Sequence, residues 1–369
     1  MGIPVFEIPE LIEKNDVRVF SSNYTLYGDM SHRVMSILSQ LAPDIEIYSV
    51  DEAFVRLGHF KKGTVGEEAT YLRAVLHQWL GIPVSVGLGP TKTLAKAANY
   101  WAKRMPRFEG VLDMSDAGQA EELLKKMPAG EVWGVGHQYE HKLKEQGIRT
   151  ALDLKRAPEH YIRKVMHTPG VRTLKELNGI SCIPLDLAPQ EKKAICISRS
   201  YGRPLTEYRD VEAATALFTA RVAEKLRSRR LKAGRFTVFL MTNRFARGPR
   251  YVNFQALDLP DPTNDTVEMN RLMVRMLKKI YRKGYSFKKS GVLVENLVSE
   301  DEPQLSFWET RDVQKQQRLM AVLDQINANM GREKLRFALQ GFDRKWKMRQ
   351  ERLSRNFTTS WAQLLEIDI

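Results

Sequence analysis

The 369-residue sequence predicts an α+β fold divided into several domains, and two observations support this. Hydrophobic residues make up 43% of the chain, which is enough for two or three separate cores. Segments with the two-residue period of strands also alternate with segments that have the 3.6-residue period of helices. The chain therefore predicts mixed helices and strands rather than a bundle or an all-β sandwich.

The charge distribution predicts a polyanionic partner. Lys and Arg number 58 against 44 Asp and Glu, a net charge of +14. Residues 221–250 hold ten bases and one acid, and residues 271–290 hold eight bases and no acid. A solvated basic face is the simpler alternative, but two such dense segments favour nucleic acid.

The first hundred residues predict the order helix, strand, strand, helix, strand. A helical stripe over 23–41 precedes two strands at 45–49 and 53–57. Thr64 and Glu67 form a capping-box pattern for a second helix that ends at Gly81. A third strand over 83–87 leads to a helix that opens at Pro90.

This order matches a ferredoxin-like unit without its first strand. Residues 1–20 contain Pro and are weakly periodic, so they supply no obvious replacement. A sheet that lacks one strand leaves backbone groups unpaired. Either one element is assigned wrongly, or the chain begins inside a domain.

Asp51 and Glu52 lie between the first two strands, at the tip of a predicted hairpin. Adjacent carboxylates at such a tip can hold a hard cation such as Mg²⁺. The alternative is a pair of solvated turn residues, since Asp is a common turn former. The spacing alone leaves both interpretations open.

The region from Met114 predicts helices around a Gly-x-Gly turn. Ser115 is the expected N-cap of a helix that ends at Met127, and a second helix spans 137–146. Gly134 and Gly136 between them are typical of a helix-hairpin-helix, in which backbone N–H groups approach a phosphate. A plain αα-corner remains the alternative.

The region over 194–298 predicts a small, strongly basic α+β domain. Strands are expected at 195–201, 235–241 and 291–297, and helices at 211–229 and 266–282. A polar break over 299–303 follows, and then a helix that ends at Gly331 and a basic tail with Trp346, Phe357 and Trp361.

Other classes of protein are not indicated. Two cysteines, Cys182 and Cys196, make no disulfide framework and fit a reducing cytoplasm. His137 and His141 lack the third ligand and the order of a zinc site. No apolar run approaches about 20 residues, and the N-terminus lacks the features of a signal peptide. We therefore expect a cytoplasmic, nucleoid-associated protein with no membrane contact.

Several motifs in order resemble the Y-family of translesion DNA polymerases. Residues 48–54 (Tyr-Ser-Val-Asp-Glu-Ala-Phe) are similar to the palm motif, and residues 87–96 to the palm segment that follows it. Residues 133–136 resemble the thumb hairpin, and residues 198–202 the start of the little finger. Residues 21–30 and the Trp346-to-Trp361 tail resemble the UmuC branch, the catalytic subunit of bacterial DNA polymerase V.

The resemblance implies a domain division and a reaction. It implies a fingers remnant over 1–20, a ferredoxin-like palm over 21–113, a helix-hairpin-helix thumb over 114–190, a little finger over 191–298, and a clamp-binding motif with a partner-binding tail over 299–369. The implied activity is template-directed nucleotidyl transfer by a DNA-directed DNA polymerase, across damaged DNA in the SOS response, with two Mg²⁺ ions.

The resemblance also implies roles for single residues. Asp51 and Glu52 match catalytic metal ligands, and Lys96 matches a lysine that contacts the incoming deoxynucleoside triphosphate. The residues implied to bind primer–template DNA are Gly134, Gly136, Arg199, Arg235 and Arg244. A sliding-clamp motif is similar to residues 304–308, with Gln304 as the polar anchor and Leu305, Phe307 and Trp308 as apolar plugs. The tail implies a UmuD′-like subunit and a RecA filament as further partners.

The sequence departs from the family at its start. Family members carry an earlier strand with an Asp-x-Asn-x-Phe-Tyr pattern, which supplies a further metal-binding Asp and the aromatic gate against ribonucleotides; this pattern does not occur here. We therefore expect an N-terminally truncated polymerase with impaired catalysis, from a misplaced start, a fragment or a broken gene. The alternatives are a non-catalytic DNA- and clamp-binding protein and, less favoured, a helix-hairpin-helix nuclease or glycosylase.

Overall fold

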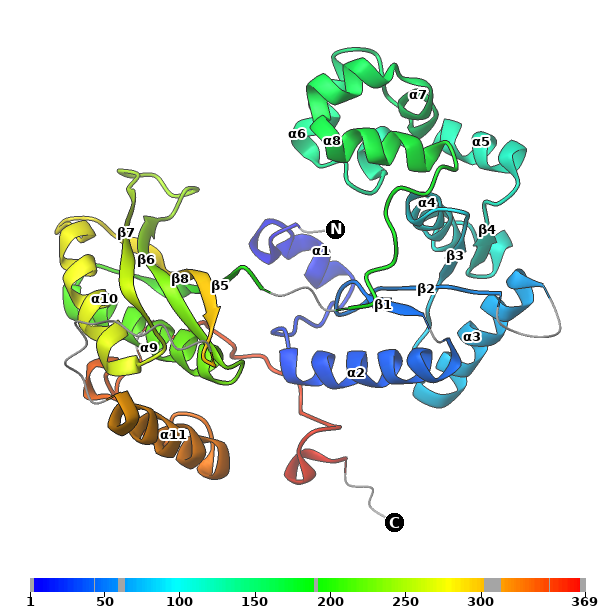
Figure 1. Ribbon diagram of the computed structural model, residues 1–369. Helices are drawn as coiled ribbons and strands as arrows, with labels where there is room; N and C mark the ends of the chain where they lie inside the picture. The colour runs from blue at the N-terminus through cyan, green and yellow to red at the C-terminus, as the bar shows by residue number, and fades with distance from the viewer. Residues whose placement is uncertain are drawn as a thin grey trace. The chain divides into compact units, whose positions relative to one another are not determined.

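The computed structural model describes residues 3–42, 44–58, 64–188, 192–301, 313–344 and 346–365. The chain forms two compact units, one of Met1–Pro189 with Arg352–Ile369 and one of Gln190–Glu351 (Figure 1). Each unit mixes helices and strands, which confirms the α+β prediction. No helix among the described residues is both long and apolar enough to span a bilayer.

The first unit contains the predicted order helix, strand, strand, helix, strand. Its leading elements are η1 (Val5–Glu7), α1 (Pro9–Lys14), α2 (Tyr24–Leu41), β1 (Ile45–Ile47), β2 (Ala53–Val55), α3 (Val65–Leu80), β3 (Val86–Leu88) and α4 (Lys92–Ala102). β1 pairs with β2 antiparallel, and β3 pairs in parallel with β4 (Val111–Asp113), after η2 (Pro106–Phe108). The sequence did not predict β4. Among the described residues, no strand joins β2 to β3, so the four strands form two separate sheets.

Helix ends in this unit follow local hydrogen bonding. The capping box at Thr64 is confirmed, with Glu67 as the reciprocal partner, and Gly81 ends α3 in the left-handed conformation. Two predicted helix starts are wrong. The helix predicted to open at Pro90 begins two residues later, at Lys92, because the Thr91 hydroxyl caps α4 by accepting the Leu94 N–H. Asp116 caps α5 (Ala117–Lys126), because its carboxylate accepts the Gln119 N–H, whereas the predicted cap Ser115 has no such bond among those the structure describes.

Five helical segments form the rest of the first unit around one apolar core. They are α5 (Ala117–Lys126), η3 (Ala129–Glu131), α6 (His137–Lys144), α7 (Ala151–Arg156) and α8 (Glu159–Leu177). α8 is interrupted at His167, whose φ of 59° is not helical, two residues before Pro169. Gly134, with φ of 90°, and Gly136, the N-cap of α6, lie in the turn that leads into α6.

Glu176 joins the helical part of the unit to α4. Its carboxylate is fully buried in α8 and accepts four hydrogen bonds. Oε2 accepts from the Thr93 N–H and hydroxyl, both at 3.0 Å, and Oε1 accepts from the N–H groups of Cys182 (2.9 Å) and Ile183 (3.0 Å). A buried carboxylate is tolerated only when it is satisfied in this way. The bonds fix the start of α4 and the segment after α8 to one side chain.

The second unit is a four-stranded sheet with the order β5-β8-β6-β7, antiparallel throughout. Its elements are β5 (Ala194–Leu205), α9 (Tyr208–Arg227), β6 (Leu231–Thr242), β7 (Val252–Thr263), α10 (Thr266–Ile280) and β8 (Phe287–Ser299). α9 and α10 lie on the same face of the sheet and enclose the core (Figure 1). The sequence predicted every element here except β7.

β7 escaped prediction because Pro260 and Pro262 lie within it. Proline lacks the N–H that a central strand needs, so it lowers the strand signal. In the structure β7 is an edge strand that pairs only with β6, and the register shifts where the two prolines lie. An edge position with a bulge accommodates both residues.

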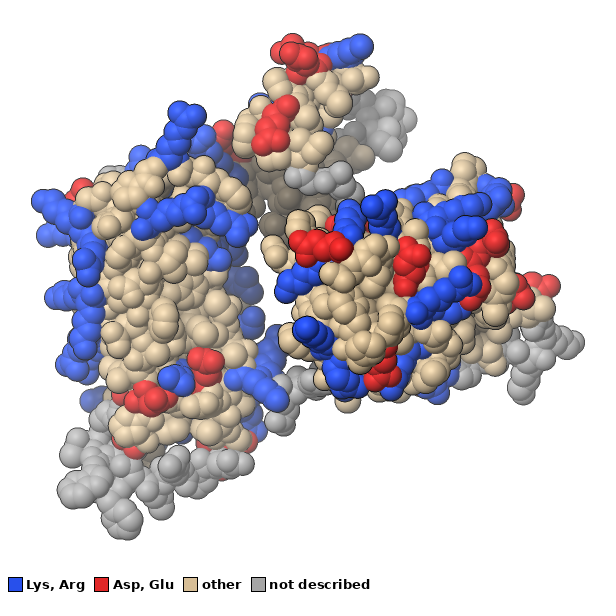
Figure 2. Space-filling view, turned by 90° about the horizontal axis from the view of Figure 1, so that it is seen from above, with Lys and Arg blue, Asp and Glu red and all other residues tan. Residues whose placement is uncertain are grey.

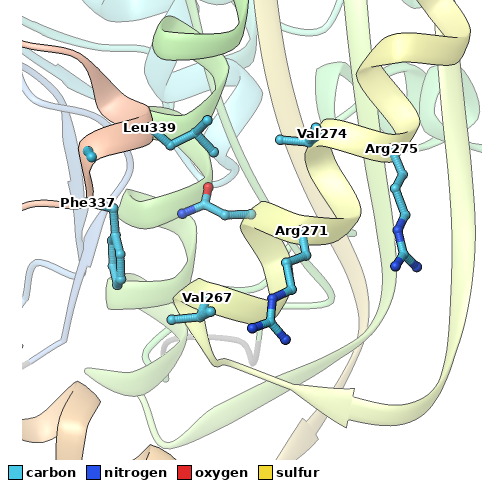
Figure 3. Close-up of a pocket in the computed structure, with 8 residues that line it drawn as sticks. Val267, Arg271, Val274, Arg275, Phe337 and Leu339 are labelled. Carbon is cyan, nitrogen blue, oxygen red and sulfur yellow. The ribbon is translucent and has the colours of Figure 1, made fainter.

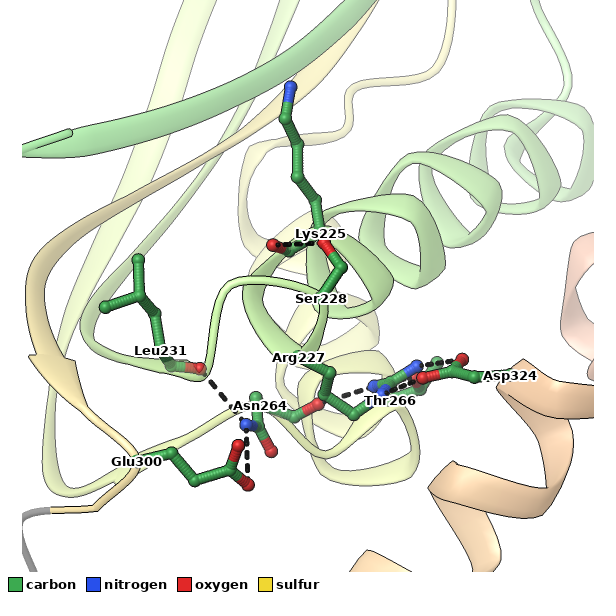
Figure 4. A network of polar contacts seen from close by, with 8 residues as sticks. All are labelled: Lys225, Arg227, Ser228, Leu231, Asn264, Thr266, Glu300 and Asp324. Atoms are coloured by element: carbon green, nitrogen blue, oxygen red, sulfur yellow. Dashed lines mark hydrogen bonds and ion pairs between the residues drawn. The ribbon is translucent and has the colours of Figure 1, made fainter. Parts of the chain in front are cut away.

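α11 (Val313–Met330) is attached to the second unit through Arg227 of α9. The guanidinium group makes a bidentate pair with Asp324 of α11, at 2.6 and 2.7 Å, and donates to the Asn264 carbonyl and the Thr266 hydroxyl (Figure 4). Asn264 in turn donates to the Leu231 carbonyl at 3.0 Å. One arginine therefore connects α9, α11 and the start of α10.

The C-terminal segment contributes to both units. Trp346 is 5% exposed and stacks edge-on against Phe218 in the core of the second unit. In the first unit, Asn23 caps α2 and donates from its amide to the Ser354 carbonyl at 3.1 Å. Phe357 and Trp361 are exposed, and η4 (Ala338–Gln340) and η5 (Trp361–Gln363) are short turns.

We expect Glu176→Gln to lower the free energy of unfolding of the first unit by about 3 kcal/mol. The amide NH₂ group would face two donors in place of an acceptor, so two hydrogen bonds to a charged group would be lost. Urea denaturation followed by circular dichroism measures the change. Glu159→Gln on the same helix, where Glu159 is half-exposed and pairs with Arg163, is the matched control. A loss equal to that of the control would contradict this role for Glu176.

Candidate functional site

The predicted hairpin is confirmed, and it places Asp51 and Glu52 at its tip. Ile45 pairs with Val55 and Ile47 with Ala53. The turn is closed by the N–H groups of Tyr48 (3.1 Å) and Ser49 (3.0 Å), which both donate to the Glu52 carbonyl. Since the backbone of the tip is fixed by these bonds, the two carboxylates emerge at defined positions.

Asp51 is an exposed carboxylate that stays ionised well below neutral pH. The Ser49 hydroxyl donates to its Oδ1 at 2.6 Å, and this bond is the main cause that holds the pKa of Asp51 below its ordinary value. The positive charges of Lys103 and Lys96 lower the pKa further. An acidic oxygen that remains charged and exposed is suited to bind a cation.

Glu52 is paired with Lys96, which reaches the hairpin from α4. The Nζ of Lys96 donates to the Oε1 of Glu52 at 2.6 Å, and both side chains are about three-quarters buried or slightly less. The same ammonium lies 5.7 Å from the centre of the Tyr48 ring. The structure therefore brings together Asp51, Glu52 and Lys96, three of the predicted site residues.

The sequence did not single out Lys92 and Glu46 for this region. Lys92 lies one turn before Lys96 and forms a largely buried ion pair with Glu46 of β1. Lys92 also donates to the Pro184 carbonyl at 2.8 Å, and Glu46 accepts from the Asp186 N–H at 2.7 Å. The available signal was the spacing of two lysines four residues apart on one helix face. Their partners come from distant segments that only the fold brings near.

A close crossing of β3 and α4 determines how near Lys92 and Lys96 lie to the hairpin. A Cβ on Gly87 would lie 2.2 Å from the Ala95 carbonyl oxygen and from the Asn99 nitrogen. Only glycine allows this approach of strand and helix. This close crossing places the lysine face of α4 toward the hairpin.

Trp133 links the Gly-x-Gly turn to the carboxylate hairpin. Its Nε1 donates to the Tyr48 hydroxyl at 3.1 Å, and its ring lies 5.6 Å from that of Tyr48 and 5.5 Å from that of Phe54. Gly134, the next residue, has φ of 90°, a conformation that favours glycine. The aromatic cluster of Tyr48, Phe54 and Trp133 therefore lies directly under the candidate site.

The predicted DNA-binding arginines of the second unit do not share one surface. Arg199 of β5 pairs in register with the fully buried Ser290, which places it on the helix-covered face of the sheet. Arg235 of β6 lies on the opposite, open face, where it pairs with Asp258 at 3.3 Å. Arg244 lies beyond the end of β6 in an exposed turn. Side chains of a strand alternate between the two faces of a sheet, so Arg199 and Arg235 face opposite ways and their roles in DNA binding stay predictions.

The remaining predictions concern metals and the clamp motif. Within the described ranges, no group of three His, Cys, Asp or Glu residues is placed to hold a metal ion. The predicted clamp-binding residues Gln304, Leu305, Phe307 and Trp308 lie outside the described residues.

Comparisons with known proteins cover nearly the whole chain. The impB/mucB/samB family model matches residues 1–100, the impB/mucB/samB family C-terminal domain matches residues 192–307, and a domain of unknown function, DUF4113, matches residues 317–367. Protein ImpB of Salmonella typhimurium is 38% identical over 99% of this chain and 87% of its own length. Protein UmuC of Salmonella typhimurium is 38% identical over 99% of this chain and 88% of its own length. A solved Y-family DNA polymerase chimera matches with a TM-score of 0.59 at 19% identity, over 81% of this chain and 83% of that one, which shows a shared fold.

We expect Ser49→Ala to raise the pKa of Asp51 toward its ordinary value, because the mutation removes the hydroxyl that stabilises the charged form. Above that ordinary value Asp51 is charged in both proteins, so the difference appears only as the pH falls into the acidic range. Carbonyl ¹³C chemical shifts measured against pH report the change. Asp153, whose lowered pKa arises from Thr150, serves as an internal control and should not move.

A double-mutant cycle of Tyr48→Phe and Trp133→Phe tests the hydrogen bond between the two rings. Both variants keep the aromatic ring and remove one hydrogen-bonding group each. We expect a coupling free energy of about 0.5–1 kcal/mol in urea denaturation, which is the usual net value of one hydrogen bond. Strict additivity of the two single variants would show that the contact adds nothing to stability.

Proposed function

This chain belongs to the impB/mucB/samB family, the UmuC branch of the Y-family DNA polymerases, and on that premise we propose that it copies damaged DNA with the Asp51–Glu52 hairpin as its catalytic centre. It is a translesion DNA polymerase by family. The relatives favour this function over the non-catalytic DNA- and clamp-binding protein. The repair nuclease or glycosylase has no support among these relatives.

The observation that carries the proposal is the convergence of Asp51, Glu52 and Lys96. The three side chains come from two segments, yet Lys96 bonds Glu52, which is 44 residues away in sequence, and lowers the pKa of Asp51. Two carboxylates beside an ammonium group suit nucleotidyl transfer, in which the hydroxyl oxygen loses negative charge as it attacks and the phosphate oxygens carry negative charge that must be stabilised. A solvated turn requires no buried lysine from another helix.

The oxygens at the tip fit Mg²⁺ as a cofactor. Magnesium is usually held by one or two carboxylates together with substrate phosphates and water, so two acidic residues suffice when the triphosphate supplies further oxygens. Asp51, with one oxygen held by Ser49 and its pKa lowered, would be the principal ligand, and Glu52 would be the second. Bound Mg²⁺ would favour ionisation of the primer 3′-hydroxyl and stabilise charge on the phosphate.

Lys96 has two partners in this scheme. In the protein without nucleotide it donates to Glu52 and holds that carboxylate in place. When a deoxynucleoside triphosphate enters, the ammonium group shifts to a phosphate oxygen and releases Glu52 toward the primer. Lys92 stays on Glu46 and the Pro184 carbonyl, and holds α4 in position during this exchange.

We assign the family's domains on the same basis: the palm to 21–113, the thumb to 114–190 and the little finger to 191–298. Gly134 and Gly136 then grip primer–template DNA through the backbone N–H groups at the start of α6, where no side chain caps the helix. Arg235 and Arg244 contact the same duplex, whereas Arg199 lies on the other face of its sheet.

The proposed partners attach through the C-terminal region. The clamp would bind residues 304–308 through Gln304, Leu305, Phe307 and Trp308. Of the tail aromatic residues, Trp346 is buried in the second unit, whereas Trp361 is 90% exposed and is the better candidate for contact with a UmuD′-like subunit or a RecA filament. The cytoplasm, where the chromosome lies, is the proposed location.

Primer extension on a template with an abasic lesion tests the catalytic proposal. We expect Asp51→Asn to lower extension by two orders of magnitude or more, because one member of a catalytic unit is removed. Asp153→Asn, which changes an exposed carboxylate elsewhere in the same unit, is the control and should retain the full rate. Extension that persists in Asp51→Asn would refute the assignment. The rate of the unchanged chain also tests the prediction of impaired catalysis.

A further inference from the structure

The basic residues of α10 form a stripe on its outer surface. Arg271, Arg275 and Lys279 recur every four residues, Lys278 lies beside the last of them, and all four are exposed. Within the described part of the chain, none of them has an acidic partner at ion-pair distance. Lys278 and Lys279 complement the dipole at the end of the helix, but Arg271 and Arg275 lie in its middle, where that explanation fails.

The α10 stripe explains the positive charge of residues 271–290 better than the open face of the sheet does. On that face, Arg235 lies in register with Asp258 on one side and Glu295 on the other, so its charge is offset by two acids. Figure 2 shows Lys and Arg gathered along the side of the unit on which α10 lies in Figure 1, with few acidic residues among them. One positive surface of this unit therefore follows α10, on the helix side of the sheet.

A pocket lies beside the stripe, between α10 and the turn η4. It has a volume of about 440 Å³ and is lined by Val267, Asn270, Arg271, Val274, Arg275, Phe337, Ala338 and Leu339. In Figure 3, Val267 and Val274 of α10 point toward Phe337 and Leu339, and Arg271 and Arg275 extend from the helix one turn apart. The volume lies within the usual range of about 300–1,000 Å³ for sites that take a small organic group.

Asn270 lines this pocket, and its amide is unsatisfied, with both the oxygen and the nitrogen themselves buried. The residue is 6% exposed, and neither its Oδ1 nor its Nδ2 has a hydrogen-bond partner among the described residues. Leaving such a buried group unpaired destabilises the free protein. The amide offers one acceptor and one donor side by side, a pattern that matches the edge of a nucleobase.

We propose that this pocket and the stripe beside it bind single-stranded nucleic acid, with phosphates on Arg271 and Arg275 and one base in the pocket. Residues four apart on a helix lie about 5–6 Å from each other, which suits successive phosphates. The base lies against the Phe337 ring, and the Asn270 amide turns to meet its edge. The site goes beyond the proposed function, since it is on the face of the sheet opposite to Arg235.

An acidic peptide is the other polyanion that the arginines could attract. The periodic spacing of the cations, the aromatic ring and the paired donor and acceptor of Asn270 together favour a chain with phosphates and planar bases. Peptide binding is therefore an outcome of the experiment and not the proposal.

Photocrosslinking locates the site in the full chain. A 12-nucleotide single strand that contains 5-iododeoxyuridine is irradiated with the protein in the presence of excess unlabelled primer–template duplex, and crosslinked peptides are identified by mass spectrometry. We expect crosslinks at Phe337. Crosslinks confined to residues 133–136 or to the open face of the sheet would overturn the proposal. Asp51→Asn should leave the Phe337 crosslink unchanged, so failure of the polymerase assignment and failure of this site are distinguishable.

Charge variants test the stripe. Arg271→Glu should lower the yield of the Phe337 crosslink about tenfold, whereas Arg209→Glu, an exposed arginine on α9 of the same unit, should leave it unchanged. Arg271→Ala should reduce the slope of log affinity against log salt by about 0.7, the value for one lost phosphate contact on a single strand. Equal effects of Arg271→Glu and Arg209→Glu would show general attraction only and refute the site.

Two further comparisons test the pocket. The unchanged protein should crosslink or bind an adenine 12-mer about fivefold better than an abasic strand of equal length, and Asn270→Leu should abolish this preference. Asn270→Leu removes an unpaired buried amide, so it should be at least as stable to urea as the unchanged protein. Equal affinity for both strands, or displacement of the adenine strand by hexaglutamate at equal concentration, would overturn the nucleic-acid assignment, the latter in favour of an acidic peptide.

Discussion

The buried carboxylate of Glu176 is the interaction on which the candidate site depends. Four donors surround it, two from Thr93 at the start of α4 and two from the segment at Cys182 and Ile183. Because α4 carries Lys92 and Lys96, the position of one side chain in α8 sets where both ammonium groups meet the hairpin. The negative charge also lies at the N-terminus of α4, where the helix dipole stabilises it. The Glu176 carboxylate thus contributes both to the stability of the first unit and to the geometry of the candidate site.

The basic residues of the second unit are divided between the two faces of its sheet. The sequence showed two basic segments and predicted a polyanionic partner from them. The fold separates the segments, since Arg235 of the first lies on the open side of the sheet and Arg271 and Arg275 of the second lie on α10 on the helix side. A polymerase that holds a duplex on one surface then has a second cationic surface for another strand.

Local patterns predicted most of the fold. The capping box at Thr64, the hairpin at Asp51 and the strands of the second unit required only neighbouring residues. The elements that were predicted wrongly have physical causes. β7 contains two prolines, which only an edge strand accommodates. Asp116, and not Ser115, caps its helix because the Asp116 carboxylate accepts the Gln119 N–H. For the site, Asp51, Glu52 and Lys96 were recognisable, but the contacts of Lys92 and Trp133 depend on segments more than 40 residues away. Sequence periodicity carries no information about such pairs.

The contact of Trp133 with Tyr48 gives the molecule a built-in optical reporter. An indole that donates a hydrogen bond beside a charged site changes its emission when the local field changes, and Lys96 lies close to the same Tyr48 ring. Trp101 and Trp346 are buried in their cores, and Trp79 and Trp361 are exposed to solvent and distant in sequence from the hairpin. Among the tryptophans that the structure describes, Trp133 is therefore the one whose fluorescence would change when a triphosphate enters at the hairpin, so substrate arrival can be followed without an attached dye.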